Sequence, residues 1–158
     1  MKFELLSDNI SIIINEILSN ERLIKLINNA DKSPLATNVG NPQKLILNKI
    51  FPTPFFEDVE TVEGIQIRIF FDNGEMQNRA ILGSEIVFQI ITPNDWWLIR
   101  KENDREAVRP YEIMSEIVNQ FEDKSISTVG ILKFHRFRYG YVNDQVTAYE
   151  LFANMSTI

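Results

Sequence analysis

Apolar residues recur at intervals of three and four along the first thirty positions, which is the period of an amphipathic helix. The residues on the apolar side are Ile10, Ile13, Ile14, Ile17, Leu18, Leu23, Ile24, Leu26 and Ile27. Ser7 and Asp8 precede them as an N-cap, and the pattern breaks near Asn20. We therefore predict one kinked helix or a helix pair over residues 8–28.

Residues 29–64 show neither a helical period nor a strand period. They begin with a run rich in Asn, Pro, Gly and Ser, which are residues that favour turns and loops. Pro52 and Pro54 then exclude a regular helix and disfavour a central strand. We predict a long extended loop over 29–64 that packs its phenylalanines onto the rest of the chain.

From residue 65 onward the period changes to two, which is typical of a half-buried strand. The isoleucines of 65–69 alternate with polar residues, and Asp72–Gly74 has the chemistry of a turn. Residues 81–91 are almost continuously apolar and predict a second, more buried strand. Residues 96–99 fit either its continuation or a strand of their own.

A second helix begins at Arg109–Pro110, because proline suits the first helical turn, where its missing N–H needs no partner. Its apolar face consists of Ile113, Met114, Ile117, Val118 and Phe121. We predict that it ends near Asp123–Lys124. Two strands, over 129–138 and 146–152, follow, and turn residues at 139–144 join them.

This order of elements indicates an α+β fold in a single domain, 1–158. We expect a mainly antiparallel sheet of about four strands, with two main helices packed on one face and long extended loops. Residues 65–158 would form its strand-strand-helix-strand-strand core.

Composition narrows the classes of function. A chain of 158 residues fits one domain, and 44% hydrophobic residues exclude global disorder. There is no cysteine and only one histidine, which excludes disulfides, thiolate nucleophiles and multi-histidine metal sites. The N-terminus lacks a signal-peptide pattern, and no apolar run is long enough to span a membrane. We expect a protein of the cytoplasm that is not an enzyme and needs no cofactor or metal.

His135 is the one residue that invites a catalytic interpretation, because histidine can act as a general base. In an alternating strand it shares a face with Lys133 and Phe137, opposite Arg136 and Arg138. No serine or carboxylate pair lies near it in the sequence to form a triad. We predict a surface or interface histidine, since an enzyme would need a pocket that joins His135 to a carboxylate.

The net charge is −6, but the charged residues are unevenly placed. The acidic patch consists of Glu57, Asp58, Glu60 and Glu63, and the basic residues are Arg100, Lys101, Arg105, Arg136 and Arg138. Oxygen ligands for a cation are one interpretation of the acidic patch, and a solvated loop is another. The overall acidity disfavours nucleic acid as a partner. We favour self-assembly, in which the acidic patch of one copy meets the basic residues of the next.

Trp96 and Trp97 are adjacent, so in a strand their rings point to opposite faces. One ring can join the core, while the other stays exposed unless something covers it. Because tryptophan is enriched in interface hot spots, both belong to the candidate interface. The alternative is that the domain's own loops cover both rings.

Several short stretches stand in a fixed order along the chain. They are Arg22–Ile27, Asn29–Leu35, Ile50–Phe55, Arg109–Met114 and Gly130–Phe134, followed by Tyr139–Tyr141. This arrangement resembles small neck proteins of tailed bacteriophages, namely tail terminators, tail-completion proteins and head–tail joining proteins. The resemblance spans most of the chain, and its motifs are structural rather than catalytic.

The resemblance implies a structural virion protein that forms a ring, with a hexamer favoured and a dodecamer as the other known order. Such a ring would cap the tail tube and join it to the head connector. Its partners would be its own copies, the tail tube protein and neck or portal-proximal proteins, with DNA only passing through the channel. It would lie in the virion neck after assembly in the host cytoplasm. The alternatives are a head-completion adaptor under the portal and, from another class, a small cytoplasmic enzyme or regulatory binding domain.

Overall fold

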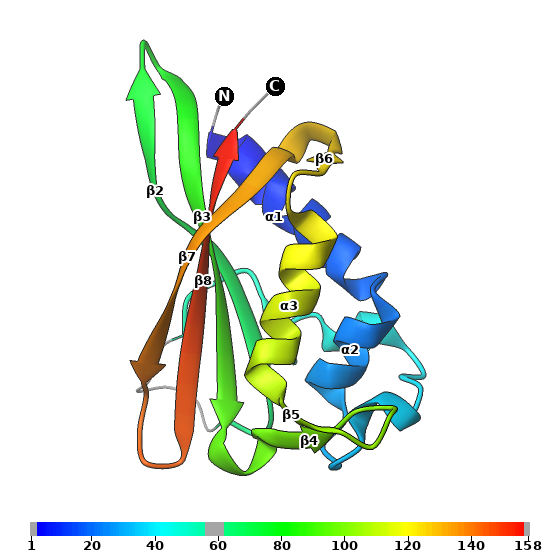
Figure 1. Ribbon diagram of the computed structural model, residues 1–158. Helices are drawn as coiled ribbons and strands as arrows, with labels where there is room; N and C mark the ends of the chain where they lie inside the picture. Colours follow the sequence, from blue (N-terminus) through cyan, green and yellow to red (C-terminus); the bar gives the residue numbers. More distant parts are fainter. Residues whose placement is uncertain (1–2, 56–61, 157–158) are drawn as a thin grey trace.

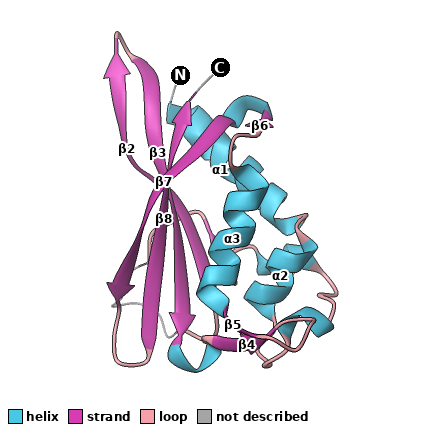
Figure 2. Ribbon diagram, in the orientation of Figure 1, coloured by secondary structure: helices cyan, strands magenta, loops and turns pink. Residues whose placement is uncertain are grey.

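Three helices cover one side of a twisted, mainly antiparallel sheet (Figures 1 and 2). The computed structural model describes residues 3–55 and 62–156. The helices are α1 (Phe3–Leu18), α2 (Glu21–Asn28) and α3 (Arg109–Phe121). The α+β class is confirmed, and residues 8–28 belong to a helix pair, which was one of the two predicted possibilities. The predicted N-cap at Ser7 and Asp8 is wrong, because α1 already begins at Phe3 and both residues lie within it.

The main sheet has six strands in the order β1-β2-β3-β8-β7-β6. Its strands are β1 (Ile50–Phe51), β2 (Gln66–Gln77), β3 (Ala80–Pro93), β6 (Ser125–Ile126), β7 (Gly130–Tyr141) and β8 (Val146–Ser156). All neighbours are antiparallel except β1 and β2, which are parallel. The sequence predicted about four strands because β1 and β6 are too short to show a period.

A separate two-stranded ribbon, β4 (Leu98–Arg100) and β5 (Glu106–Val108), leads into α3. A short 3₁₀ turn at Asn94–Trp96 separates β4 from β3. Residues 98–100 therefore form a strand of their own, which was one of the two predicted possibilities.

The core lies between the helices and the sheet face that they cover. The strands contribute Ile67, Ile69, Ile86, Phe88, Ile90, Leu132, Leu151 and Ala153, and the helices contribute Ile13, Ile17, Leu23, Leu26, Ile113, Ile117 and Phe121. Burying one large aliphatic or aromatic side chain contributes about 1.5–3 kcal/mol. Packing therefore stabilises the first two helices, whose many isoleucines have modest helix propensity.

Residues 29–64 are more regular than the predicted loop. Two 3₁₀ turns, Pro34–Ala36 and Pro42–Leu45, and strand β1 lie within them. These short elements interrupt the predicted loop, and the sequence does not reveal them because each is too short to leave a period. Both turns begin with a proline, but a proline in the sequence indicates a loop equally well.

The proline segment after β1 crosses the sheet face opposite the helices. The Phe55 backbone N–H donates to Oε1 of Gln89 on β3, at 3.0 Å. The buried Arg68 guanidinium stacks 3.7 Å from the centre of the Phe51 ring and donates to Thr53 Oγ1 at 2.9 Å. The segment therefore packs Phe51 and Phe55 onto this face, as predicted.

Strands β2 and β3 continue past the main body as a long arm, which consists of residues 72–83 (Figure 1). The predicted turn at Asp72–Gly74 is wrong, because the ladder runs through it with a register shift between Phe71 and Asn73. The chain reverses instead at Asn78 and Arg79, whose left-handed φ angles are 50° and 66°. Two left-handed residues suit the twist of a hairpin, although no glycine marks the site.

One arginine joins the helices, the 3₁₀ turn and the loop after α2. Arg109 is only 1% exposed, and its Nε donates to the Trp96 carbonyl at 3.0 Å. Its Nη1 and Nη2 donate to the carbonyls of Leu26, Asn29 and Asp31 at 2.8, 2.6 and 3.0 Å. Burial lowers the pKa of Arg109 to about 10, and Asp31 opposes this shift. Its hydrogen bonds fix where α3 begins relative to α2.

Candidate interaction surface

Strand β7 is an edge of the sheet along most of its length. It pairs with β6 only at Gly130 and Ile131, and an isolated bridge joins Leu132 to Glu122. The Phe134 N–H donates to the Glu122 carboxylate at 2.8 Å. Beyond that point, no strand in the described part of the chain pairs with the outer side of residues 135–141. An unpaired edge of this length is a template for pairing with another strand.

The helix side of this edge is aromatic and exposed. Phe137, Tyr139 and Tyr141 of β7 are 65%, 53% and 67% exposed. Tyr111, on the first turn of α3, is 50% exposed. Its ring contacts Tyr149, and Phe137 and Tyr139 contact the same ring. We call the four exposed residues, Tyr111, Phe137, Tyr139 and Tyr141, the aromatic edge. Aromatic side chains are large contributors to binding interfaces, so this is the strongest candidate surface.

Tyr149 of β8 is the centre against which the aromatic edge packs. Its hydroxyl lies 3.0 Å from the Tyr111 hydroxyl, and its ring contacts Phe137 and Tyr139 at centroid distances of 6.3 and 5.6 Å. Burial and the hydrogen bond to Tyr111 raise the pKa of Tyr149 to about 12. The aromatic edge is therefore supported by fixed rings beneath it and is not a loose set of side chains.

An apolar groove continues the aromatic edge between α3 and β7. Its volume is about 490 Å³, and it is lined by Tyr111, Met114, Ser115, Val118, Asn119, Phe137 and Leu151. The charged residues of α3 lie elsewhere on the helix, since this lining contains none. The groove and the edge together form one continuous apolar surface.

The opposite side of β7 is charged. Arg136 lies 3.8 Å from the centre of the buried Phe152 ring, and its Nη2 lies 3.8 Å from Glu85 Oε1. Arg138 donates to Glu150 Oε1 at 2.6 Å, and this pairing raises the pKa of Arg138. Arg136 and Arg138 therefore share one face, as predicted.

His135 occupies a bulge, because the register shifts between Phe134 and Arg136. Its Nε2 lies 2.7 Å from Glu85 Oε2. Strict alternation does not hold through the bulge, so the predicted sharing of a face by Lys133, His135 and Phe137 is wrong. Phe137 lies on the helix side, while His135 meets Glu85 on the charged side.

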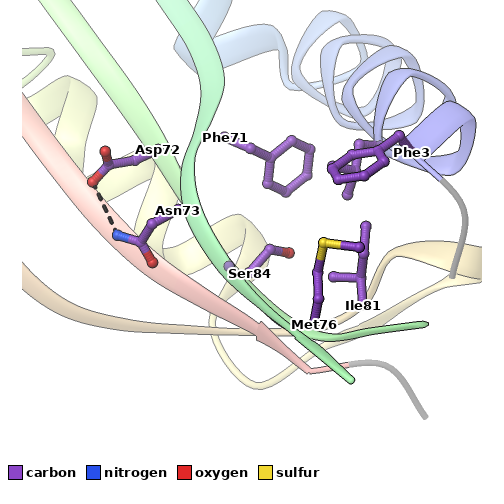
Figure 3. A pocket seen from close by; sticks show the side chains of 9 residues that line it. Phe3, Phe71, Asp72, Asn73, Met76, Ile81 and Ser84 are labelled. Atoms are coloured by element: carbon purple, nitrogen blue, oxygen red, sulfur yellow. Dashed lines mark hydrogen bonds between the residues drawn. The ribbon is translucent and has the colours of Figure 1, made fainter. Parts of the chain in front are cut away.

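The base of the arm holds an apolar pocket of about 350 Å³ beside the start of α1 (Figure 3). Phe71, just before the arm, and Met76 and Ile81 within it point toward Phe3, whereas Asp72 and its neighbour Asn73 point away (Figure 3). The arm thus keeps the two-sided character of the sheet, with apolar side chains on the helix side. Met76 and Leu82 remain 56% and 53% exposed.

Both tryptophans are partly buried, but they pack against different parts of the molecule. Trp96 packs on the core and under the Arg109 guanidinium, which lies 5.0 Å from its ring centre. Trp97 is half-buried, and its Nε1 donates to Thr147 Oγ1 at 3.0 Å. Its ring contacts Tyr111 and Tyr149, so it supports the aromatic edge from behind.

The predicted basic residues do not form one patch. Arg100 lies in β4, and Lys101 and Arg105 lie in the turn to β5, in the small ribbon beneath the helices (Figure 1). Arg136 and Arg138 instead belong to β7 of the main sheet and lie on the face away from the helices. Arg100 pairs with Asp104 at 3.5 Å, and Lys101 with Glu112 at 3.1 Å.

Of the predicted acidic patch, Glu57, Asp58 and Glu60 lie outside the described residues. Glu63 is exposed, and its carbonyl accepts a hydrogen bond from Lys49 Nζ at 2.9 Å. Within the described ranges no group of three His, Asp or Glu residues could hold a metal ion. No described helix is both long and apolar enough to cross a membrane.

Sequence reasoning missed the aromatic edge as a site. The interleaved Phe137, Tyr139 and Tyr141 were visible, but alternating aromatics in a strand are more simply interpreted as core. What exposes them is the position of β7 at the edge, which depends on strand order. The sequence signal that could have found them is the three neighbouring cations Lys133, Arg136 and Arg138, because a central strand rarely holds so many charges.

The fold defines a small α+β domain with an open, aromatic sheet edge and a projecting arm. The model of the YomW family matches residues 20–155, and the chain therefore belongs to the YomW family. This family indicates a phage origin. No curated protein matches the chain.

Proposed function

We propose that this protein is a structural subunit of a tailed-phage neck, a tail terminator or tail-completion protein that works as a homo-oligomeric ring. The open aromatic edge of β7 carries the proposal, because a subunit that works alone gains nothing from a long open strand edge with exposed rings. The phage origin of the family and the resemblance to neck proteins support the same role.

In this role the sheet and the helices form the body of the ring. The arm and the β4–β5 ribbon project from opposite ends of the subunit, which suits contacts with the tail tube on one side and the head connector on the other (Figure 1). The ring, a hexamer in the favoured order, lies in the virion neck, and DNA passes through its channel. A head-completion adaptor under the portal would use the same surfaces with the partners exchanged.

One observation favours an enzyme as the second candidate. His135 meets Glu85, which is the histidine–carboxylate pair that an enzyme would need. The neighbouring Ser84 hydroxyl is buried without a hydrogen-bond partner in the described chain, and alternation along β3 turns it to the helix side. A nucleophile is therefore not beside the pair, and we favour a structural pair.

The test is native mass spectrometry of the purified protein, alone and mixed with tail-tube or portal-neck components. A closed ring, or a monomer that becomes a ring on the tube, supports the terminator. Binding to the portal-side components alone supports the adaptor. A monomer that binds neither contradicts both neck roles and favours the enzyme.

A matched pair of variants sharpens this test. Tyr139→Lys places a charge on the aromatic edge and should abolish ring formation. His135→Ala should leave the ring intact, because the histidine lies on the other side of the sheet. Loss of the ring in His135→Ala but not in Tyr139→Lys would contradict the assignment of the surface. Charge reversal at Arg100, Lys101 and Arg105 tests whether the ribbon joins the neck.

A further inference from the structure

We propose that the outer edge of β2 in one copy pairs with the outer edge of β7 in the next, so that one sheet continues from subunit to subunit. This inference rests on the proposed ring and names its interface. The partner that binds the aromatic edge is thus a second copy of this chain, and that copy binds through its arm.

The geometry of the sheet supplies the first argument. Strands β2 and β7 lie toward opposite ends of the strand order, and each is covered only in part. On β2, the two-residue β1 pairs at Ile67 and Arg68, and no described strand pairs with the outer side of residues 69–77. One copy therefore offers two different unpaired edges, which is what a head-to-tail contact needs.

The helix sides of the two edges match because both are apolar. On β2, Phe71 and Met76 point to the helix side, and Met76 is more than half exposed. On β7, Phe137 and Tyr139 point to the same side of the sheet. If the sheet continues, these side chains become neighbours, and methionine packs favourably against aromatic rings.

The opposite sides of the two edges match because their charges are opposite. Residues 69–77 contain two acidic residues, Asp72 and Glu75, and no basic one. Residues 132–141 contain Lys133, Arg136 and Arg138 and no acidic one. Glu75 lines a groove on the charged side with Glu85, so the acids of one edge and the arginines of the other lie on the same side. Opposite charges across a strand pair are favourable.

The same charges disfavour symmetric pairing. Two β7 edges would bring three cations against three cations, and two β2 edges would bring acid against acid. Like charges directly opposite are destabilising in a sheet, so the charge pattern selects β2 against β7. A heterologous contact of this kind closes into a ring when the rotation between neighbours divides a full turn, and otherwise gives a filament.

Crosslinking between single-cysteine variants tests the contact directly, because the chain has no cysteine of its own. Isotope-labelled Met76→Cys is mixed with unlabelled Tyr139→Cys, and a short bismaleimide is added under conditions in which light scattering shows association. The mass of each dimer then reports which variants were joined. The control replaces Tyr139→Cys with Leu98→Cys on β4, because Leu98 is 64% exposed.

We expect at least tenfold more mixed dimer for Met76→Cys with Tyr139→Cys than for the control or for either variant alone. In a Met76→Cys background, Glu75→Lys should lower that yield several-fold, whereas Glu106→Lys on β5 should not. If the protein associates but the Tyr139→Cys and Leu98→Cys mixtures crosslink equally, the β2–β7 contact is overturned, while the proposed ring is not contradicted. If the protein stays monomeric alone and with tail-tube or portal-neck components, both the inference and the neck function fail.

Discussion

Arg109 and Arg136 are the same side chain in opposite settings. Arg109 is enclosed, and four backbone carbonyls accept its hydrogen bonds. Arg136 lies on an edge strand, half exposed above the Phe152 ring, with Glu85 3.8 Å away. Arg109 therefore satisfies its polar groups within the chain, while Arg136 lies on a strand edge whose aromatic rings stay exposed. Changes inside should therefore affect stability, and changes at the edges should affect association.

Arg109→Met should have the largest effect in this comparison. It removes the donor to four carbonyls, of which those of Leu26 and Asn29 are buried, and each buried acceptor left without a partner costs about 1–3 kcal/mol. Urea unfolding measures the loss. Arg79→Met, at the exposed tip of the arm, is the matched control and should change stability by less than about 0.5 kcal/mol. An Arg109→Met variant within 1 kcal/mol of the parent would refute the role of Arg109.

Gly74→Ala should follow, because it distorts the arm without touching the core. A Cβ at this position would lie 2.8 Å from the Gly83 carbonyl oxygen of the facing strand. Overpacking against backbone costs about 1–3 kcal/mol. Thermal unfolding checks this against Gly40→Ala, where a Cβ meets nothing within 4 Å. Equal melting temperatures in the two variants would mean that the arm accommodates the added Cβ without loss of stability.

Phe137→Ser should separate association from stability. Its side chain is 65% exposed, so we expect a loss of less than about 1 kcal/mol in the free energy of unfolding. Analytical ultracentrifugation should show at least tenfold weaker self-association, because the Phe137 side chain belongs to the aromatic edge. Unchanged association would place the interface elsewhere.

Tyr149→Phe should have the smallest effect, and only at alkaline pH. The pKa of Tyr149 is raised to about 12, against about 10 in an unfolded chain. The unfolded state therefore loses its proton first, and this residue makes stability fall between pH 10 and pH 12 but not below pH 10. Urea unfolding at pH 8 and pH 11 should show a smaller fall in Tyr149→Phe. An identical fall in both proteins would contradict the shift.

The elements that the sequence predicted best are those whose signal is local. Helix α3 begins at Arg109, as its proline indicates, and ends at Phe121, two residues before the predicted end. The aspartate–asparagine–glycine run was misleading, because a bulge can use the same residues as a turn. The chain reversal at Asn78 and Arg79 has no glycine to indicate it in the sequence. Its position follows from how far the pairing of β2 with β3 extends.

The candidate site was predictable only in part. Arg136 and Arg138 were expected together and are together, but the edge that carries them was not foreseen. Which strand lies at an edge depends on pairings between distant residues, such as Val87 with Phe152, and periodicity contains no record of these. The same reason hid the meeting of His135 with Glu85, fifty residues apart.

The place of β8 in the sheet has a consequence for synthesis. β8 follows every other strand along the chain, yet it lies between β3 and β7. While it is still inside the ribosome, β3 and β7 have no partner on their inner sides, and the nascent chain exposes two further edges. We therefore expect refolding to be limited by the insertion of β8, which must close contacts with residues some sixty positions earlier. Slowing that step should divert the chain into aggregates before any ring can form.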